Sequence, residues 1–219
     1  MRSGRGSRGA EVALKMGRPI VGGIEGKKMA AEATVWRNGR TKRAGECFIK
    51  ESLPPYDDLY RSPAEILIKY IGLKAAGVPV VPTLRISEDQ ILMTDLSDGG
   101  ENFIYSTDMY IDSTVKQRRL AFQLEPDNPE LVRKKVHEAA EKAARAQYKL
   151  ELDAYFLVVT PMGEVAVIVG DLGLGVAKVY DKDVEVMIRD NLGSASLFYK
   201  KAMKVLGIKD PPPLINQST

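Results

Sequence analysis

The chain has 219 residues, of which 44% are hydrophobic and 28% are charged, proportions that are ordinary for a globular protein. No apolar run approaches the length of a membrane-spanning helix, and the polar, glycine-rich N-terminus lacks the apolar core of a signal peptide. Cys47 is the only cysteine and excludes an internal disulfide, so we expect a cytoplasmic protein in which Cys47 is a buried small hydrophobe.

The net charge of +3 hides an asymmetry along the chain. Residues 1–50 hold 12 Lys and Arg against 4 Glu, whereas the remainder holds 20 against 25. Gly and Ser separate the first arginines, so residues 1–16 are predicted to form a basic, flexible tail. A basic N-terminal region can also bind nucleic acid or an acidic partner through nonspecific charge, and this alternative stays open.

Strands are predicted after this tail, from about residue 20 to residue 50. Asn38-Gly39 is a strong signal for a hairpin turn between strands at 32–37 and 45–50. Gly99-Gly100 marks an expected boundary between two lobes.

A helix is predicted to begin at Ser62, with Pro63 in the first helical position and Glu65 completing a capping box. Gly77 is expected to end this helix. Its expected apolar face consists of Ile66, Leu67, Tyr70, Ile71 and Ala75.

The remaining chain alternates short strands with two longer helices. Strands are predicted at about 83–86 and 90–94, a hairpin at 157–160 and 165–169, and helices at 128–149 and 182–206. The pattern of residues 101–126 is ambiguous. The predicted organisation is a tail (1–16), an N-terminal lobe (17–98), a C-terminal lobe (99–210) and a second tail (211–219).

Residues 165–175 are the most informative stretch. An apolar strand ends in Asp171, and Gly173 and Gly175 allow a sharp turn beside the carboxylate. Such a carboxylate is a hard oxygen ligand, suited to Mg²⁺ that also touches phosphate oxygens. Strand-Asp-x-Gly turns are common, so this stretch gains its meaning from the segments that precede it.

The order of strands, helix, two strands, long helix, hairpin and Asp-x-Gly turn resembles the protein-kinase fold. The chain is similar in particular to the small atypical kinases of the RIO family and the kinase of the KEOPS complex. The resemblance covers about residues 28–205 and implies an α+β, two-lobed fold with a five-stranded N-terminal lobe and a mainly helical C-terminal lobe. The segments that carry it are Ala31-Glu32-Ala33, Phe48-Ile49-Lys50, Glu65 with Lys74–Pro79, Leu92–Gly99 and Asp171–Gly175.

This resemblance implies roles for individual residues. Lys50 would hold the phosphate oxygens of ATP, Glu65 would orient Lys50, and Asp171 would hold Mg²⁺ bridging the phosphates. Backbone groups of residues 94–96 would read the adenine edge. The expected nucleotide-binding residues are Glu32, Lys50, Thr94, Asp95 and Leu96.

The catalytic loop departs from the family pattern of His-Gly-Asp followed by Asn five residues after the Asp. Asp153 precedes Asp171 by 18 residues, the usual interval between the catalytic base and the metal ligand, but Val158 then stands where the Asn is expected. If the strands are aligned instead, Glu151 takes the base position and Phe156 the Asn position. Both alignments lack the second metal ligand and the histidine.

Three functions remain open from these residues. The first is an atypical ATP-dependent kinase or ATPase of weak activity that uses Mg²⁺, Lys50, Glu65, Asp153 and Asp171. The second is a pseudokinase that acts as a regulatory or scaffolding subunit of a protein complex. The third is association with nucleic acid through the basic N-terminus, which is compatible with either. His137, the one histidine, is expected on a helix surface.

Overall fold

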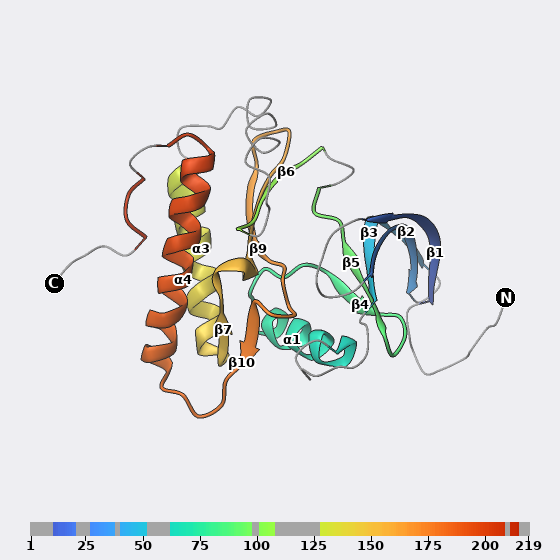
Figure 1. Cartoon of the computed structure of the whole chain (residues 1–219), viewed down its shortest axis with the longest axis horizontal. Coiled ribbons are helices and arrows are strands. Elements are labelled where there is room, and N and C mark those ends of the chain that lie inside the picture. The colour runs from blue at the N-terminus through green and yellow to red at the C-terminus, as the bar shows by residue number, and fades with distance from the viewer. Residues whose placement is uncertain are drawn as a thin grey trace.

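In the computed structural model of the protein, the described residues are 11–20, 27–37, 40–51, 62–97, 101–107, 128–208 and 211–214. These segments form an α+β fold (Figure 1). The strands are β1 (Glu11–Ile20), β2 (Lys27–Arg37), β3 (Arg40–Glu51), β4 (Thr83–Arg85), β5 (Gln90–Thr94), β6 (Phe103–Tyr105), β7 (Tyr148–Leu150), β8 (Tyr155–Val159), β9 (Val165–Val169) and β10 (Val176–Lys178). The helices are α1 (Pro63–Ala75), α3 (Asn128–Arg145), α4 (Val184–Val205) and a single 3₁₀ turn, η3 (Leu152–Ala154).

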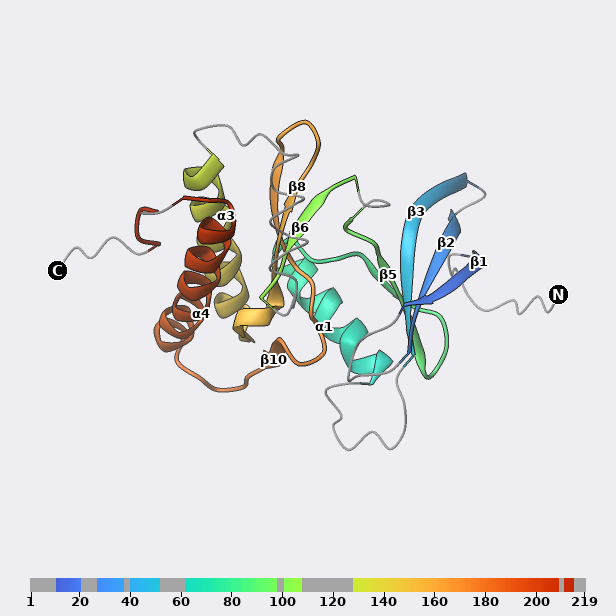
Figure 2. The same cartoon turned by 45° about the horizontal axis from the view of Figure 1, so that its top comes forward.

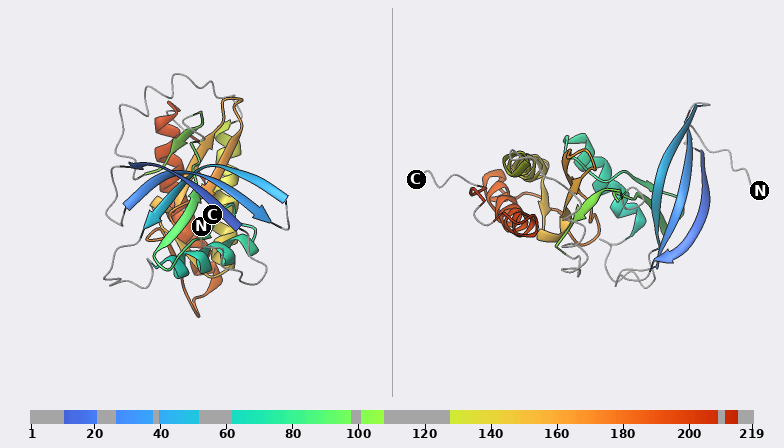
Figure 3. Two further views of the ribbon diagram at one scale, coloured as in Figure 1. Left: turned by 90° about the vertical axis from the view of Figure 1, so that its right-hand side faces the viewer. Right: turned by 90° about the horizontal axis from the view of Figure 1, so that it is seen from above.

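The first half of the chain builds an antiparallel sheet of five strands in the order β1-β2-β3-β5-β4. Arg37 of β2 lies opposite Arg40 of β3, which confirms the hairpin predicted at Asn38-Gly39. Cys47 lies in β3 and is buried, as expected. The sheet stands at one end of the molecule, away from α3 and α4 (Figure 3).

Helix α1 follows this sheet's third strand and lies between the sheet and the rest of the chain (Figure 2). It begins as predicted, because the Ser62 hydroxyl accepts a hydrogen bond from the Glu65 backbone N–H at 3.2 Å. Its predicted apolar face is partly wrong, since the Ile71 side chain is exposed and the Lys69 side chain is completely buried. The buried stripe of α1 consists of Pro63, Ile66, Lys69 and Leu73.

Helices α3 and α4 pack against each other and against the sheets of the second half (Figure 1). The apolar face predicted for α3 is confirmed, since every member is fully buried: Val132, Val136, Ala139, Ala140 and Ala143. His137 lies on the surface of this helix, as expected, 3.9 Å from the Glu141 carboxylate.

The predicted extent of α3 to residue 149 is wrong. The helix ends at Arg145, Gln147 adopts a left-handed φ of 61°, and residues 148–150 form β7 instead. Strand β7 pairs with β10, with Leu150 opposite Val176. This pairing joins segments distant in the sequence, so local helix propensity does not reveal it.

The hairpin predicted at residues 157–169 is confirmed as β8 and β9, with Val159 opposite Val165. Strand β6 joins it on the other side of β8. Helix α4 is also confirmed, and its N-cap Asp183 accepts a hydrogen bond from the Val186 N–H at 3.0 Å. Among the described residues, no helix combines the length and apolarity needed to cross a bilayer.

The two predicted tails partly belong to the fold. Strand β1 begins at Glu11, inside the range 1–16, and residues 1–10 lie outside the described part of the chain. Leu214 is buried, and the Arg133 guanidinium of α3 donates a hydrogen bond to the Pro213 carbonyl at 3.2 Å. The lobe boundary expected at Gly99-Gly100 also lies outside the described residues.

Candidate functional site

Two loops of the second half lie against each other. They are the connection between β7 and β8 (residues 151–154) and the turn between β9 and β10 (residues 170–175). The Glu151 N–H donates to the Gly175 carbonyl at 2.8 Å, and the Gly170 N–H donates to the Ala154 carbonyl at 2.9 Å. The fold therefore brings the predicted residues Asp153 and Asp171 onto neighbouring loops.

Gly175 is required by this close approach. A Cβ at Gly175 would lie 2.9 Å from both the Ala154 Cα and the Asp171 carbonyl oxygen. Both atoms belong to the backbone and cannot swing away, so only glycine fits between the two loops.

Asp171 begins the turn and shapes it. One of its carboxylate oxygens, Oδ1, accepts a hydrogen bond from the Gly173 N–H at 3.1 Å. This is the local side-chain-to-backbone bond of an Asx turn, which sets the direction of the chain two residues after the aspartate.

Helix α1 supplies a buried cation to the same turn. The Lys69 ammonium donates hydrogen bonds to the carbonyl oxygens of Leu172, at 3.1 Å, and Gly173, at 2.9 Å. The side chain is 0% exposed, and a buried charge is stable only where polar groups replace water. The turn therefore depends on a residue about one hundred positions earlier in the chain.

The segment after α1 links the five-stranded sheet to this turn. The Val169 N–H donates to the Pro79 carbonyl at 2.8 Å, and the Val81 N–H donates to the Val169 carbonyl at 2.9 Å. The Thr94 N–H at the end of β5 donates to the Pro82 carbonyl at 3.0 Å. The end of β5 and the end of β9 are thus held by the same four-residue segment, 79–82.

The predicted adenine-reading segment, residues 94–96, begins at the last residue of β5. The Asp95 carboxylate accepts a hydrogen bond from the Ser97 N–H at 2.8 Å, and the Leu96 carbonyl accepts one from the Asn102 side chain at 2.9 Å. The Thr94 N–H and the Leu96 carbonyl are thus engaged within the fold, and the predicted contact of this segment with adenine stays a prediction.

Lys50 and Glu32 lie on the five-stranded sheet. Lys50 is on β3, opposite Lys28 of β2 and Ile91 of β5, and Glu32 is on β2, opposite Glu46. Their side chains lie outside the described part of the structure, so the predicted ion pair between Lys50 and Glu65 stays a prediction.

Glu65 lies in the first turn of α1 and is partly buried. It is near Tyr148 of β7, and the hydroxyl of this tyrosine lies against Gly72 of the same helix. Burial raises the pKa of the Tyr148 phenol, and the charges of Tyr180 and Glu65 raise it further. The carboxylate of Glu65 thus contributes to the field at the junction of α1 with the second half.

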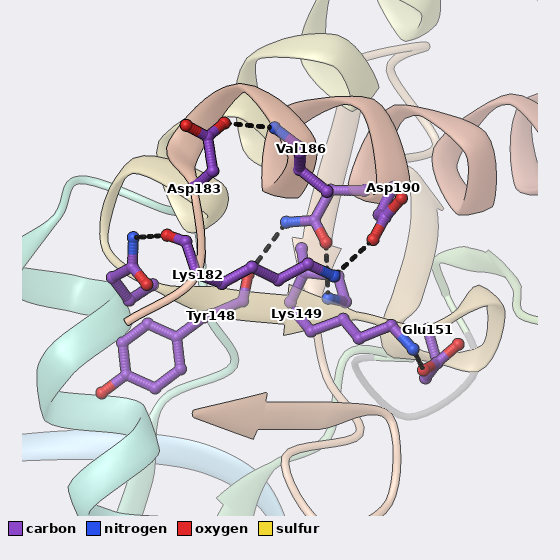
Figure 4. A network of polar contacts seen from close by, with 10 residues as sticks. Tyr148, Lys149, Glu151, Lys182, Asp183, Val186 and Asp190 are labelled. Carbon is purple, nitrogen blue, oxygen red and sulfur yellow. Dashed lines mark hydrogen bonds and ion pairs between the residues drawn. The ribbon is translucent and has the colours of Figure 1, made fainter. Parts of the chain in front are cut away.

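The two candidates for the catalytic base have different surroundings. Glu151 has a side chain that is 47% exposed and is ion-paired with Lys149 at 2.6 Å. Asp153 lies within η3, and its Oδ1 atom is buried. Figure 4 shows the Lys149–Glu151 pair on the same side of β7 as the pair between Lys182 and Asp190.

The position of the missing asparagine is apolar in both alignments. Val158 is buried within β8. The Phe156 ring lies against Gly170, the residue before Asp171, because a Cβ at Gly170 would be 2.5 Å from that ring. An aromatic ring beside the predicted metal ligand cannot supply a second oxygen to the metal.

Asn191 of α4 holds the strand β7, which leads into the connection that contains Glu151 and Asp153. The buried Asn191 amide accepts a hydrogen bond from the Leu150 N–H at 2.9 Å. It donates to the carbonyls of Tyr148, at 2.9 Å, and Ala140, at 3.1 Å. These bonds fix the end of β7 to both long helices.

The donor set suits one magnesium ion shared with a ligand and does not suit a protein-made metal cage. Among the described residues, no group of three or more His, Cys, Asp or Glu side chains could hold a metal ion. Mg²⁺ is commonly held by one or two carboxylates together with substrate phosphates. Asp171, fixed in its turn, fits the single-carboxylate form of such a site.

Sequence reasoning missed Lys69 and Asn191. Lys69 falls among Ile66 and Leu73 at helical spacing, so a charged residue within an apolar stripe was the available signal. Asn191 gave no such signal, because its hydrogen-bond partners Leu150, Ala140 and Tyr148 lie far from it in the sequence.

No protein-family model matches the chain, and no curated protein is significantly similar to it.

Proposed function

We propose that this chain is a kinase-like ATP-binding protein that catalyses slow phosphoryl transfer from Mg-ATP to an acceptor or to water. The observation that carries this proposal is that two parts of the predicted site are hydrogen-bonded to the same segment, residues 79–82. That segment bonds both to the end of β5, where adenine would bind, and to the end of β9, which leads into Asp171.

The position of each predicted residue along the fold supports the proposal. Lys50 lies on the third strand of the sheet and Glu65 on the helix that follows it. Asp171 comes two residues after the end of the β8–β9 hairpin, on the loop next to Glu151 and Asp153. These are the places that the family resemblance assigns to the ATP-binding lysine, its glutamate, the metal ligand and the base.

The residues would act mainly by positioning and by electrostatic stabilisation. Lys50 would bind phosphate oxygens, and Asp171 would orient the ion that neutralises the charge on the transferring group. Magnesium, when bound, supplies that neutralisation. A base must reach the acceptor hydroxyl, and the exposed Glu151 is better placed for this than Asp153, which has one buried oxygen.

The absence of the second metal ligand is the reason to expect a slow rate. With Val158 or Phe156 in place of asparagine, the chain offers one fixed carboxylate to magnesium. General acid–base assistance is typically worth about 10²–10⁴ in rate. Weak activity can therefore persist where the base is imperfect, provided that the nucleotide is held correctly.

The test is steady-state ATP turnover in the presence of Mg²⁺, with and without generic protein acceptors. We expect Lys50→Ala and Asp171→Ala to lower turnover about 100-fold or more, the scale of losing one electrostatic group from an active site. Lys74→Ala removes an exposed lysine, and Asp190→Asn removes the charge of a half-buried carboxylate that is ion-paired with Lys182. Neither residue has a role in the proposed site, so both variants should leave turnover unchanged. Equal turnover by the parent and both site variants would refute the assignment.

A second candidate function is a pseudokinase that serves as a regulatory or scaffolding subunit. It is favoured by the short connection between β7 and β8, which leaves only residues 151–154 to form a catalytic loop. It predicts nucleotide binding without turnover. Robust, Mg²⁺-dependent phosphate transfer by the purified chain would rule it out.

A further inference from the structure

One peptide unit connects Lys69 to Asp171. The carbonyl of Leu172 accepts a hydrogen bond from the Lys69 ammonium at 3.1 Å. The N–H of the same peptide unit belongs to Gly173 and donates to the Asp171 carboxylate at 3.1 Å. In a trans peptide the C=O and the N–H point in opposite directions, so a cation and an anion lie at the two ends of one peptide dipole.

This arrangement determines how the peptide is oriented. A positive charge at the carbonyl end and a negative charge at the N–H end both favour the same direction of the dipole. Each hydrogen bond polarises the peptide and strengthens the other. A second bond from Lys69, to the Gly173 carbonyl at 2.9 Å, resists rotation of the next peptide.

We infer that Lys69 is a positioning residue for Asp171 and acts on it through the Leu172–Gly173 peptide. The role in metal binding rests on the proposed function, in which Asp171 holds magnesium. By fixing the N–H that bonds to Asp171, Lys69 fixes the rotamer of that carboxylate before any ligand arrives. The carboxylate of Asp171 is then already oriented in the folded protein, so magnesium binding does not have to order it. This preorganisation increases the affinity for magnesium.

A matched control lies on the same helix. Lys74 of α1 is exposed and donates to the Tyr70 hydroxyl at 3.0 Å. It has no bond to the turn at residues 171–175 among those described. Lys74→Met therefore removes a lysine side chain from the same helix but leaves the hydrogen bonds of the Leu172–Gly173 peptide intact.

The experiment compares the parent, Lys69→Met and Lys74→Met by two measurements on the full chain. The first is amide hydrogen exchange by NMR at Gly173, with the Leu206 N–H, bonded to Ala202 in the last turn of α4, as the remote reference. The second is calorimetric binding of a non-hydrolysable ATP analogue with and without Mg²⁺. The ratio of the two Kd values measures how much magnesium assists binding.

We expect Lys69→Met to accelerate exchange at Gly173 by about tenfold or more relative to Leu206, the scale of losing a hydrogen bond to a charged group. The assistance by magnesium should fall by a similar factor, whereas binding of the analogue without magnesium should change little. Lys74→Met should match the parent in both measurements.

Three results would overturn the inference. They are unchanged exchange at Gly173, exchange accelerated equally at Gly173 and Leu206, and accelerated exchange at Gly173 with undiminished assistance by magnesium. If the parent itself shows no magnesium-assisted binding, the proposed function fails, and selective acceleration at Gly173 still supports the control of the turn by Lys69.

A second variant covers the case in which Lys69→Met does not fold. Lys69→Gln keeps N–H donors and removes the charge, so it should move both measurements in the same direction by a smaller factor. Parent-like values for Lys69→Gln would contradict the role of the charge.

Discussion

Tyr155 shows how a single polar atom is tolerated in the core of this protein. Its side chain is fully buried, and its ring stacks on Phe198 of α4 with centroids 5.3 Å apart. Within the described part of the chain, the hydroxyl has no hydrogen-bond partner. Burial, and secondly the charge of Glu151, raise the pKa of the phenol far above its ordinary value.

Tyr155→Phe should therefore stabilise the protein, by about 1 kcal/mol near neutral pH, because it removes a buried hydroxyl that makes no hydrogen bond to any described residue. The gain should grow at alkaline pH. Above about pH 10 the unfolded tyrosine loses its proton while the folded one keeps it, so the parent loses up to about 1.4 kcal/mol per pH unit. Urea unfolding from pH 7 to pH 11 measures the difference, and a pH-independent difference would contradict this account.

The sequence predicted the roles of some residues and not of others. Asp171 was predictable because a strand, an acid and glycines adjoin in the sequence, and the turn has that form. Lys69 was not, because its hydrogen-bond acceptors lie more than one hundred residues away. Ile71 was placed in the core by helical spacing, but the structure leaves its side chain exposed.

At the scale of elements, two helical glycines have opposite surroundings. Gly72 of α1 faces Tyr148 of β7, and a Cβ there would lie 2.0 Å from the tyrosine hydroxyl oxygen. Gly193 of α4 has open space around the same position. In Figure 4 the Tyr148 ring extends toward α1, which is the contact that Gly72 permits.

Alanine at these two positions should change stability in opposite directions. Gly193→Ala should raise the free energy of unfolding by about 1 kcal/mol, the usual difference in helix propensity. Gly72→Ala carries the same propensity gain but forces Tyr148 from its place, and overpacking costs about 1–3 kcal/mol. Thermal unfolding of the two variants is the comparison.

The Tyr148→Phe change in the Gly72→Ala background is the control. It removes the atom nearest to the new methyl group and should recover part of the loss. Equal stabilisation by both alanines would show that α1 does not dock on β7 through Gly72.

Elements with local signals were predictable and those with distant partners were not. The N-cap of α1 and the hairpin of β8 and β9 depend on residues close together in the sequence, and both were correctly expected. Strands β6 and β10 have three residues each and form only because they pair with segments distant in the sequence, β8 and β7. Strand β7 was assigned to a helix for the same reason.

At the scale of the whole molecule, α1 and segment 79–82 join the five-stranded sheet to the second half. Lys69 bonds to the turn after β9, and the residues after α1 bond to Val169 and to Thr94. A displacement of α1 would therefore move the turn of Asp171 relative to the sheet. The order of the longer elements was predictable from the sequence. This coupling was not, because it depends largely on backbone groups, which carry no sequence signal.

Calorimetric titration of the purified chain with ATP, with and without Mg²⁺, tests the central claim most directly. We predict that magnesium strengthens binding to the parent and to Asp190→Asn, and that Asp171→Ala loses this assistance while remaining folded by circular dichroism. At about 100 times its Kd, Mg-ATP should also raise the free energy of unfolding by about 2.7 kcal/mol. An absence of ATP binding by the folded parent, or full assistance by magnesium in Asp171→Ala, would contradict the account.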